Sequence, residues 1–354
     1  MLDLQPSSRS LPMKNRHLIA LGAMATIFSL SVVSAEPQKD QVTKPQSVAA
    51  SAQESTAQQI QRLSYTAQNQ SENVQRRVDA LHQLSQFPNQ NALVAVSRAL
   101  KDSNSDIRQA AIVGAKPYQF EYRWKLVAPL LNDESSDVQL AALVNLIPDY
   151  TNMHEQQQQE LDKIYPSAIK QLKQHSGSEK QLLLADVYRW HQDFSSAELI
   201  YQQLITNPAM ATQVSLSLSD NYRAQQQDEN ALEVLNRAIE NDSTSAQLYY
   251  SKALTLVRIG NKNEAANAIE QATKYSPDNS YYWYLNGVLQ EPIDVAKATD
   301  SFEKAYLISG APEQLYAVCD IYVRTGHEKA DACLTELEKV APPYVIEELK
   351  NKGK

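Results

Sequence analysis

The chain has 354 residues, a formal net charge of −8 and a hydrophobic content of 43%, with only 8 glycines and 2 cysteines. These values exclude a collagen-like chain, a disulfide-rich miniprotein and wholesale disorder, and they leave room for two or three domains or one long repeat array. The acidic balance also argues against nucleic acid and anionic membranes as partners, because both repel a negatively charged surface.

Residues 1–35 have the layout of a secretory signal peptide. Basic residues precede an apolar run over 18–33, and the small residues Ser34 and Ala35 follow it. We therefore expect cleavage near residue 35 and export to a bacterial periplasm, with no membrane insertion of the mature chain. An uncleaved anchor in the inner membrane is the alternative, because the apolar run approaches spanning length.

Residues 36–56 contain almost no large apolar side chains, so they cannot offset the entropy of ordering. We predict a flexible linker there. Residues 36–354 together carry 30 basic and 40 acidic side chains, a net charge of −10. This balance favours protein partners, basic ones in particular.

A phrase of the form L-x-D-x-x-S-D-[IV]-x-x-A-A occurs at 100–111 and again 31 residues later at 131–142. In each copy, Ser105 or Asp106, and likewise Ser136 or Asp137, is positioned to cap the following helix, and the paired alanines allow close helix contact. The phrase resembles the short, lyase-type HEAT repeat, in which a helix opens with Asp-Val-Arg, as at residues 106–108. The resemblance implies HEAT-like helix pairs over 57–150.

Residues 151–177 connect this region to a different repeat. We predict connecting helices here, including a long helix over 155–174 that is interrupted at Pro166, because proline lacks the backbone donor that a helix interior requires.

A set of three residues, the second four positions after the first and the third three positions after the second, recurs five times over 178–342. The first residue is small, the second is large, and the third is small or large. The sets begin at Ala197, Ala231, Ala265, Ala298 and Ala330. About 12 positions upstream of each set lies a small residue: Ala185, Ser219, Ala253, Gly287 and Cys319. Units of about 34 residues with this interlock resemble tetratricopeptide (TPR) repeats. The predicted fold is therefore an all-α solenoid of HEAT-like helix pairs followed by about five TPR-like pairs, with a C-terminal capping helix and tail at 343–354.

The two cysteines, Cys319 and Cys333, fall on the two helices of the last unit. In an oxidising compartment they would form a disulfide that stabilises that unit by roughly 3 kcal/mol. Two buried thiols are the alternative.

The TPR resemblance implies that the first helix of each unit lines a concave groove. An Asp-x-Tyr-(x)-Arg signature recurs on these helices, and arginine forks and aromatic side chains suit peptide recognition. The alternative is that the arginines pair with aspartates of their own or adjacent helices. Within the aromatic run 281–284 we expect Trp283 in the core. The candidate groove residues are Asp186, Arg189, Trp190, Asp220, Arg223, Tyr250, Leu254, Arg258, Tyr281, Tyr284, Tyr316, Asp320 and Arg324.

The sequence contains no haem-attachment motif, no Gly-rich phosphate loop and no His-Glu-x-x-His, and its six histidines share no ligand spacing. We predict no cofactor, no metal site and no enzymatic activity. HEAT-like then TPR repeats after a signal peptide are similar to the C-terminal region of some multihaem c-type cytochromes, which implies a scaffold accessory to a cytochrome or respiratory complex. The alternative is an assembly or tethering factor for outer-membrane, cell-wall or polysaccharide machinery.

Overall fold

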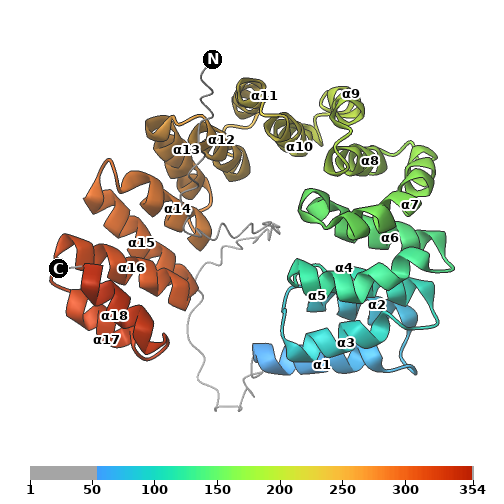
Figure 1. Cartoon of the computed structure of the whole chain (residues 1–354), viewed down its shortest axis with the longest axis horizontal. Coiled ribbons are helices and arrows are strands. Elements are labelled where there is room, and N and C mark those ends of the chain that lie inside the picture. The colour runs from blue at the N-terminus through green and yellow to red at the C-terminus, as the bar shows by residue number, and fades with distance from the viewer. Residues whose placement is uncertain (1–53, 353–354) are drawn as a thin grey trace, which may run out of the picture. The chain divides into compact units, whose positions relative to one another are not determined.

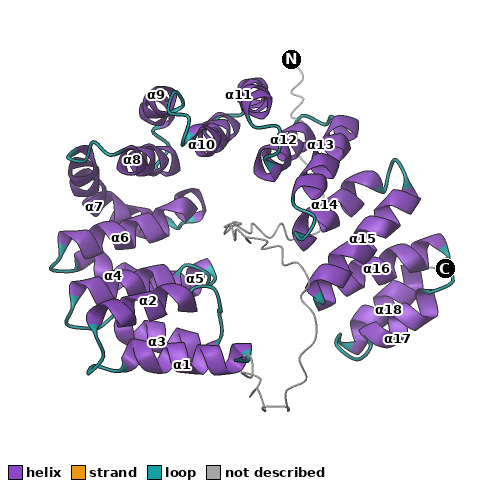
Figure 2. Cartoon of the chain, turned by 180° about the vertical axis from the view of Figure 1, so that it is seen from behind, coloured by secondary structure: helices purple, strands orange, loops and turns teal. Residues whose placement is uncertain are grey.

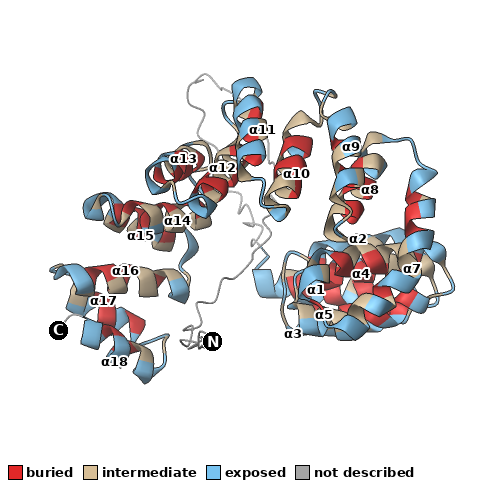
Figure 3. Ribbon diagram, turned by 45° about the horizontal axis from the view of Figure 1, so that its top comes forward, coloured by how far each residue is buried: buried red, intermediate tan, exposed pale blue. Residues whose placement is uncertain are grey.

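The computed structural model describes residues 54–352, so the predicted signal peptide and most of the predicted linker lie outside the described residues. Within 54–352 the regular elements are eighteen α-helices and two short 3-10 helices, with no strand (Figures 1 and 2). In Figure 3 buried residues, coloured red, occur on helices from one end of residues 54–352 to the other. This confirms the predicted all-α solenoid. No helix in this part of the chain is long and apolar enough to cross a membrane.

The helices of residues 56–173, called the front array below, pack on the next helix and on the next but one, as α2 packs on both α1 and α4. They are α1 (Thr56–Gln68), α2 (Val74–Leu84), α3 (Gln90–Ala99), α4 (Ser105–Ala115), α5 (Phe120–Val127), η1 (Ala128–Asn132), α6 (Ser136–Leu146), η2 (Ile147–Asn152) and α7 (Glu155–Lys173). The predicted linker ends against α1, because Ser55 caps that helix with its side chain.

Two sequence expectations about the front array are wrong in detail. The capping side chain of α4 is Asn104, which accepts from the backbone N–H groups of residues 106 and 107 at 2.8 and 3.3 Å. Ser105 and Asp106 are already inside the helix. At α6 the cap position is Ser135, also one residue earlier than expected, and its side chain makes no capping hydrogen bond. Several cap-forming residues stand in a row in both copies, so composition alone does not decide the position.

Pro166 does not interrupt α7, which runs unbroken from Glu155 to Lys173. The proline costs the helix one backbone hydrogen bond. Leu161 and Leu172, on either side of Pro166, are fully buried, and burial of this apolar stripe stabilises the continuous helix.

Buried ion pairs link successive units of the front array. Arg77 of α2 donates to Asp102 at 2.6 Å, and Arg108 of α4 donates two hydrogen bonds to Asp133 at 2.7 and 2.8 Å. Both arginines and both aspartates are 31 residues apart, the period of the repeated phrase. The four side chains are only 7–11% exposed. Where the period would place a third arginine, Gln139 donates instead to the backbone oxygen of Asp133 at 2.7 Å.

Residues 178–352, called the rear array, contain five helix pairs and a last helix. These are α8 (Ser178–Trp190), α9 (Phe194–Leu204), α10 (Ala211–Ala224), α11 (Asp228–Asn241), α12 (Ala246–Arg258), α13 (Lys262–Tyr275), α14 (Ser280–Gln290), α15 (Val295–Ser309), α16 (Pro312–Thr325), α17 (Ala330–Leu337) and α18 (Pro343–Lys352).

The small–large interlock holds each pair of the rear array together. The small positions on the first helices are buried, and so are the large residues facing them, Tyr201, Leu235, Ile269, Phe302 and Leu334. The tightest case is Gly287, where an added Cβ would lie 2.6 Å from the ring of Phe302. A side chain larger than hydrogen does not fit there without moving the ring.

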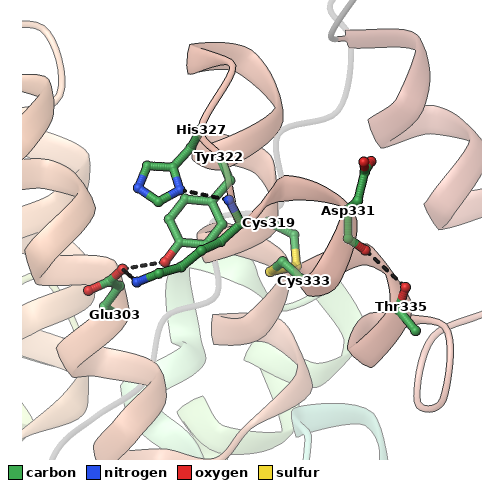
Figure 4. Close-up of a disulfide and its surroundings, with 8 residues drawn as sticks. Glu303, Cys319, Tyr322, His327, Asp331, Cys333 and Thr335 are labelled. Carbon is green, nitrogen blue, oxygen red and sulfur yellow. Dashed lines mark hydrogen bonds and ion pairs between the residues drawn. A yellow bond between two sulfur atoms is a disulfide. The ribbon is translucent and has the colours of Figure 1, made fainter.

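A disulfide joins Cys319 of α16 to Cys333 of α17, with the Cα atoms 5.4 Å apart (Figure 4). The disulfide lies beside the small–large contact of the last pair, because Cys319 is its small position and Cys333 precedes Leu334. Helix α18 packs on α16 and buries Ile346 and Leu349, which covers the apolar side of the terminal pair. Beside the disulfide, Tyr322 stacks on His327 with ring centroids 4.2 Å apart and donates a hydrogen bond to Glu303.

Candidate functional site

The thirteen predicted groove residues all lie on the first helices of the five rear pairs: α8, α10, α12, α14 and α16. Helix α10 also contacts both α8 and α12, so these three first helices lie side by side (Figure 1). None of the thirteen side chains is buried. We call this surface the first-helix face.

Each arginine of the first-helix face is held by an acidic side chain. Arg189 and Asp186 are 3.4 Å apart, and Arg223 pairs with Asp220 one helical turn away. Arg258 reaches from α12 to Asp228 at the start of α11, at 2.8 Å. The structure therefore favours the alternative weighed for these residues, in which the arginines pair with aspartates of their own or adjacent helices.

The pair on α8 is the most enclosed, because it involves the fully buried Tyr201. The hydroxyl of Tyr201 donates to Asp186 at 2.6 Å and accepts from Arg189 at 3.3 Å. Burial, followed by the Asp186 carboxylate, raises the pKa of the Tyr201 hydroxyl, which therefore stays a hydrogen-bond donor. Arg189 and Asp186 thus orient a core tyrosine as well as facing outward.

At the other end of the face, Arg324 donates to Asp320 at 2.7 Å and to Glu291 at the end of α14. Lys352 of α18 donates to Asp320 and to the Tyr316 hydroxyl, each at 3.0 Å. The hydrogen bond to Tyr316 is the first cause that raises the pKa of Lys352. The sequence reasoning missed Glu291, Lys352 and Asp228, because their partners are 30–36 residues away, as in the pairs Asp320–Lys352 and Asp228–Arg258.

Aromatic side chains form the middle of the first-helix face. Tyr250 lies against Tyr282 with ring centroids 5.2 Å apart and against Tyr281 at 6.1 Å, and Tyr284 lies 5.8 Å from Phe302. The expectation that Trp283 is a core residue is wrong: its ring is partly exposed, and its indole N–H donates to the carbonyl oxygen of Pro277 at 2.8 Å. The buried member of the run is Tyr282.

Two cavities lie outside the first-helix face. One of about 320 Å³ lies between α6 and α7, and one of about 370 Å³ lies between α9, α10 and α11. Over residues 54–352, no group of three or more metal-ligating side chains comes together. The first-helix face thus offers rigid aromatic surface and fixed charges, the features by which a protein surface binds another chain.

The stacked helix pairs and their repeated interlock define a helical-repeat protein. Residues 246–279, which span α12 and α13, match the tetratricopeptide repeat family. No curated protein matches the chain.

Solved structures similar to this chain include TPR proteins. MamA is 21% identical over 48% of this chain and 95% of that chain, with a TM-score of 0.38. MamA from Desulfovibrio magneticus RS-1 is 12% identical, covering 47% and 96%, with a TM-score of 0.39. YrrB, described as a TPR protein with an unusual peptide-binding site, is 15% identical, covering 53% and 97%, with a TM-score of 0.41.

Proposed function

We propose that the chain is a non-catalytic scaffold that binds an extended segment of a partner protein along the first-helix face. The observation that carries this proposal is the row of aromatic and charged side chains on five first helices, none of which is buried. Tyrosine and tryptophan lose little conformational entropy on binding and serve as anchors. The paired arginines are held in place, so they add specificity rather than a separate carboxylate clamp.

An exported, periplasmic location fits this proposal. The disulfide of the last pair is of the kind that persists in oxidising compartments and is rare in the cytosol. Together with the signal-peptide layout of residues 1–35, this favours action in the bacterial envelope. An uncleaved inner-membrane anchor would leave the same array on the same side of the membrane.

The order of repeats, HEAT-like and then TPR, supports a role beside a c-type cytochrome or respiratory complex, by architectural analogy. The second candidate is an assembly or tethering factor for outer-membrane, cell-wall or polysaccharide machinery, favoured by the acidic charge of a long interaction surface. The partner captured by the first-helix face distinguishes the two.

The test uses a photoreactive amino acid, p-benzoylphenylalanine, placed in the full chain in its own host. Position 254 suits it, because Leu254 lies between Tyr250 and Arg258 on the first-helix face, is partly exposed and takes part in no ion pair. The matched control is position 240, where Glu240 is exposed on the second helix α11. We expect a discrete cross-linked species from position 254 and none from position 240. Equal labelling from both positions, or none from either, overturns the assignment; a haem-positive species supports the cytochrome accessory role.

A further inference from the structure

The cavity of about 370 Å³ between α9, α10 and α11 is separate from the first-helix face, since none of the thirteen face residues lines it. Its apolar wall includes Ile205 and Val234, and its polar rim includes Arg237 and Asn241. Ser215 of α10 forms part of the floor. The cavity thus combines an apolar interior with a cationic side chain at its edge.

The repeat register explains why the rear array has a cavity at this place. Ser219 and Ala253, the small positions on the first helices of successive units, are 34 residues apart. By the same offset, Ser215 corresponds to Tyr249 in the next unit, and Asn241 corresponds to Tyr275. In that next unit the two tyrosine rings stack with centroids 5.6 Å apart. A serine and an asparagine at the same two positions leave the space open.

The unit after that shows what the space accepts. There the position of Ser215 is occupied by Trp283, and the position of Arg237, six residues after the interlocking alanine, is occupied by Lys304. The ammonium of Lys304 lies 4.3 Å from the centroid of the Trp283 ring, a cation–π contact. Two neighbouring units of the same array therefore fill this position with an aromatic ring of their own.

We propose that the cavity at Ser215 is a docking site for an aromatic side chain supplied by a partner, which enters between α9 and α11 and lies beneath Arg237. A tryptophan or tyrosine ring would bury its faces against Ile205 and Val234. This site is distinct from the scaffold role of the first-helix face and does not depend on it.

The charges around the cavity determine what flanks that ring. Several lining side chains donate hydrogen bonds to carboxylates. Gln202 and Tyr222 donate to Glu198 at 2.8 and 2.7 Å. Thr212 donates to Asp242 at 3.1 Å, and Arg237 forms an ion pair with Glu233. Three carboxylates, those of Glu198, Glu233 and Asp242, thus lie one hydrogen bond or ion pair away from the lining, which itself holds one guanidinium, that of Arg237. Over residues 178–352 there are 25 acidic and 15 basic side chains, so the wider field has the same sign. The segment that fits is an aromatic residue flanked by lysine or arginine.

The experiment uses the full chain and the peptide Lys-Lys-Bpa-Lys-Lys, in which Bpa is p-benzoylphenylalanine, with adducts located by mass spectrometry. We expect adducts on α9 and α11 residues of the cavity, suppressed by an excess of Lys-Lys-Trp-Lys-Lys and not by Lys-Lys-Ala-Lys-Lys. A Glu-Glu-Bpa-Glu-Glu peptide should give weak labelling, because the carboxylates at the mouth repel it. Adducts spread over other surfaces, or equal labelling by the acidic peptide, would overturn the proposal.

The variants Ser215→Tyr and Asn241→Tyr fill the cavity with the side chains that the next unit carries. Each should lower the labelling at least about tenfold while leaving the melting temperature unchanged or raised, and two independent filling variants guard against one that fails to fold. The matched control is Gln181→Tyr, at the corresponding position of the first rear unit, where labelling should be unchanged. Undiminished labelling in a folded filling variant would rule out the site. Cross-linking from position 254 reports separately on the first-helix face.

Discussion

The two arrays use arginine–aspartate pairs for different purposes. In the front array, Arg77–Asp102 and Arg108–Asp133 are enclosed between units, with side chains at most 11% exposed. In the rear array the units are held by small–large packing, and the pairs are more exposed: the side chains of Arg189 and Asp186 are 16% and 17% exposed, and that of Arg258 is 45% exposed. Charge follows the same division: residues 54–177 carry 13 acidic and 12 basic side chains, whereas 178–352 carry 25 and 15. The two front pairs are closed off between units, whereas the rear pairs remain partly open to solvent and to a partner.

The difference between the arginine pairs of the two arrays is tested most directly at Arg108. Arg108→Ala leaves Asp133 enclosed without its bidentate partner, and we expect a loss of about 3–5 kcal/mol in the free energy of unfolding, measured by urea denaturation with circular dichroism. The matched change on the rear array, Arg258→Ala, should cost less, about 1 kcal/mol, because the Arg258 side chain is 45% exposed and water can take its place beside Asp228. Equal effects of the two changes would show that the arrays do not differ in this respect.

The small–large packing of the rear array is tested at Gly287. Gly287→Ala places a methyl group against Phe302 and should destabilise the protein by about 1–3 kcal/mol, as measured by thermal unfolding. Adding Phe302→Leu to that variant should recover part of the loss, because the shorter side chain makes room. Gly177→Ala, where an added Cβ meets nothing within 4 Å, serves as the control. A neutral Gly287→Ala would contradict the interlock.

Acid should affect the buried pairs of the front array. Burial disfavours the Asp102 and Asp133 carboxylates, but hydrogen bonds from Arg77, Arg108 and the backbone outweigh it and lower both pKa values below 3.8. A depressed folded-state pKa means that the stabilisation is intact above pH 3.8 and is lost as the pH falls further. Each unit of pKa lowering corresponds to about 1.4 kcal/mol. Urea titrations between pH 5 and 2, roughly the span over which such a carboxyl titrates, should show this loss in the wild type and a smaller one in Asp133→Asn. An identical pH profile in the two proteins would refute it.

The smallest effect concerns the turns inside the rear pairs. Gln192, Gln226 and Gly260 occupy successive equivalent positions with positive φ of 68°, 61° and 80°. A side chain disfavours this conformation. Gln226→Gly should therefore raise the free energy of unfolding by up to about 1 kcal/mol, seen as a higher melting temperature. Gly260→Ala should lower it by a similar amount. A lower melting temperature for Gln226→Gly than for Gly260→Ala would count against this explanation.

The periodic spacing of small and large residues predicted the stacked pairs, because each side chain in that pattern contacts a partner in the same or the next helix. What the sequence could not supply was the pairing of side chains 25 or more residues apart, such as Arg108 with Asp133. The capping residue Asn104 was missed because three neighbours could cap equally well. The cavity at Ser215 escaped notice because it results from two small residues on different helices, each unremarkable alone.

The disulfide between Cys319 and Cys333 has a consequence for how the molecule comes apart. In a stacked array each unit is supported only by its neighbours, so loss of structure starts where support is one-sided, at an end. At the C-terminal end the cross-link prevents α16 and α17 from separating, and α18 covers them. A pull or a protease acting on that end must displace the whole terminal pair at once. Unfolding of the stacked helices therefore starts preferentially at the N-terminal end of the front array and proceeds toward the C-terminal pair.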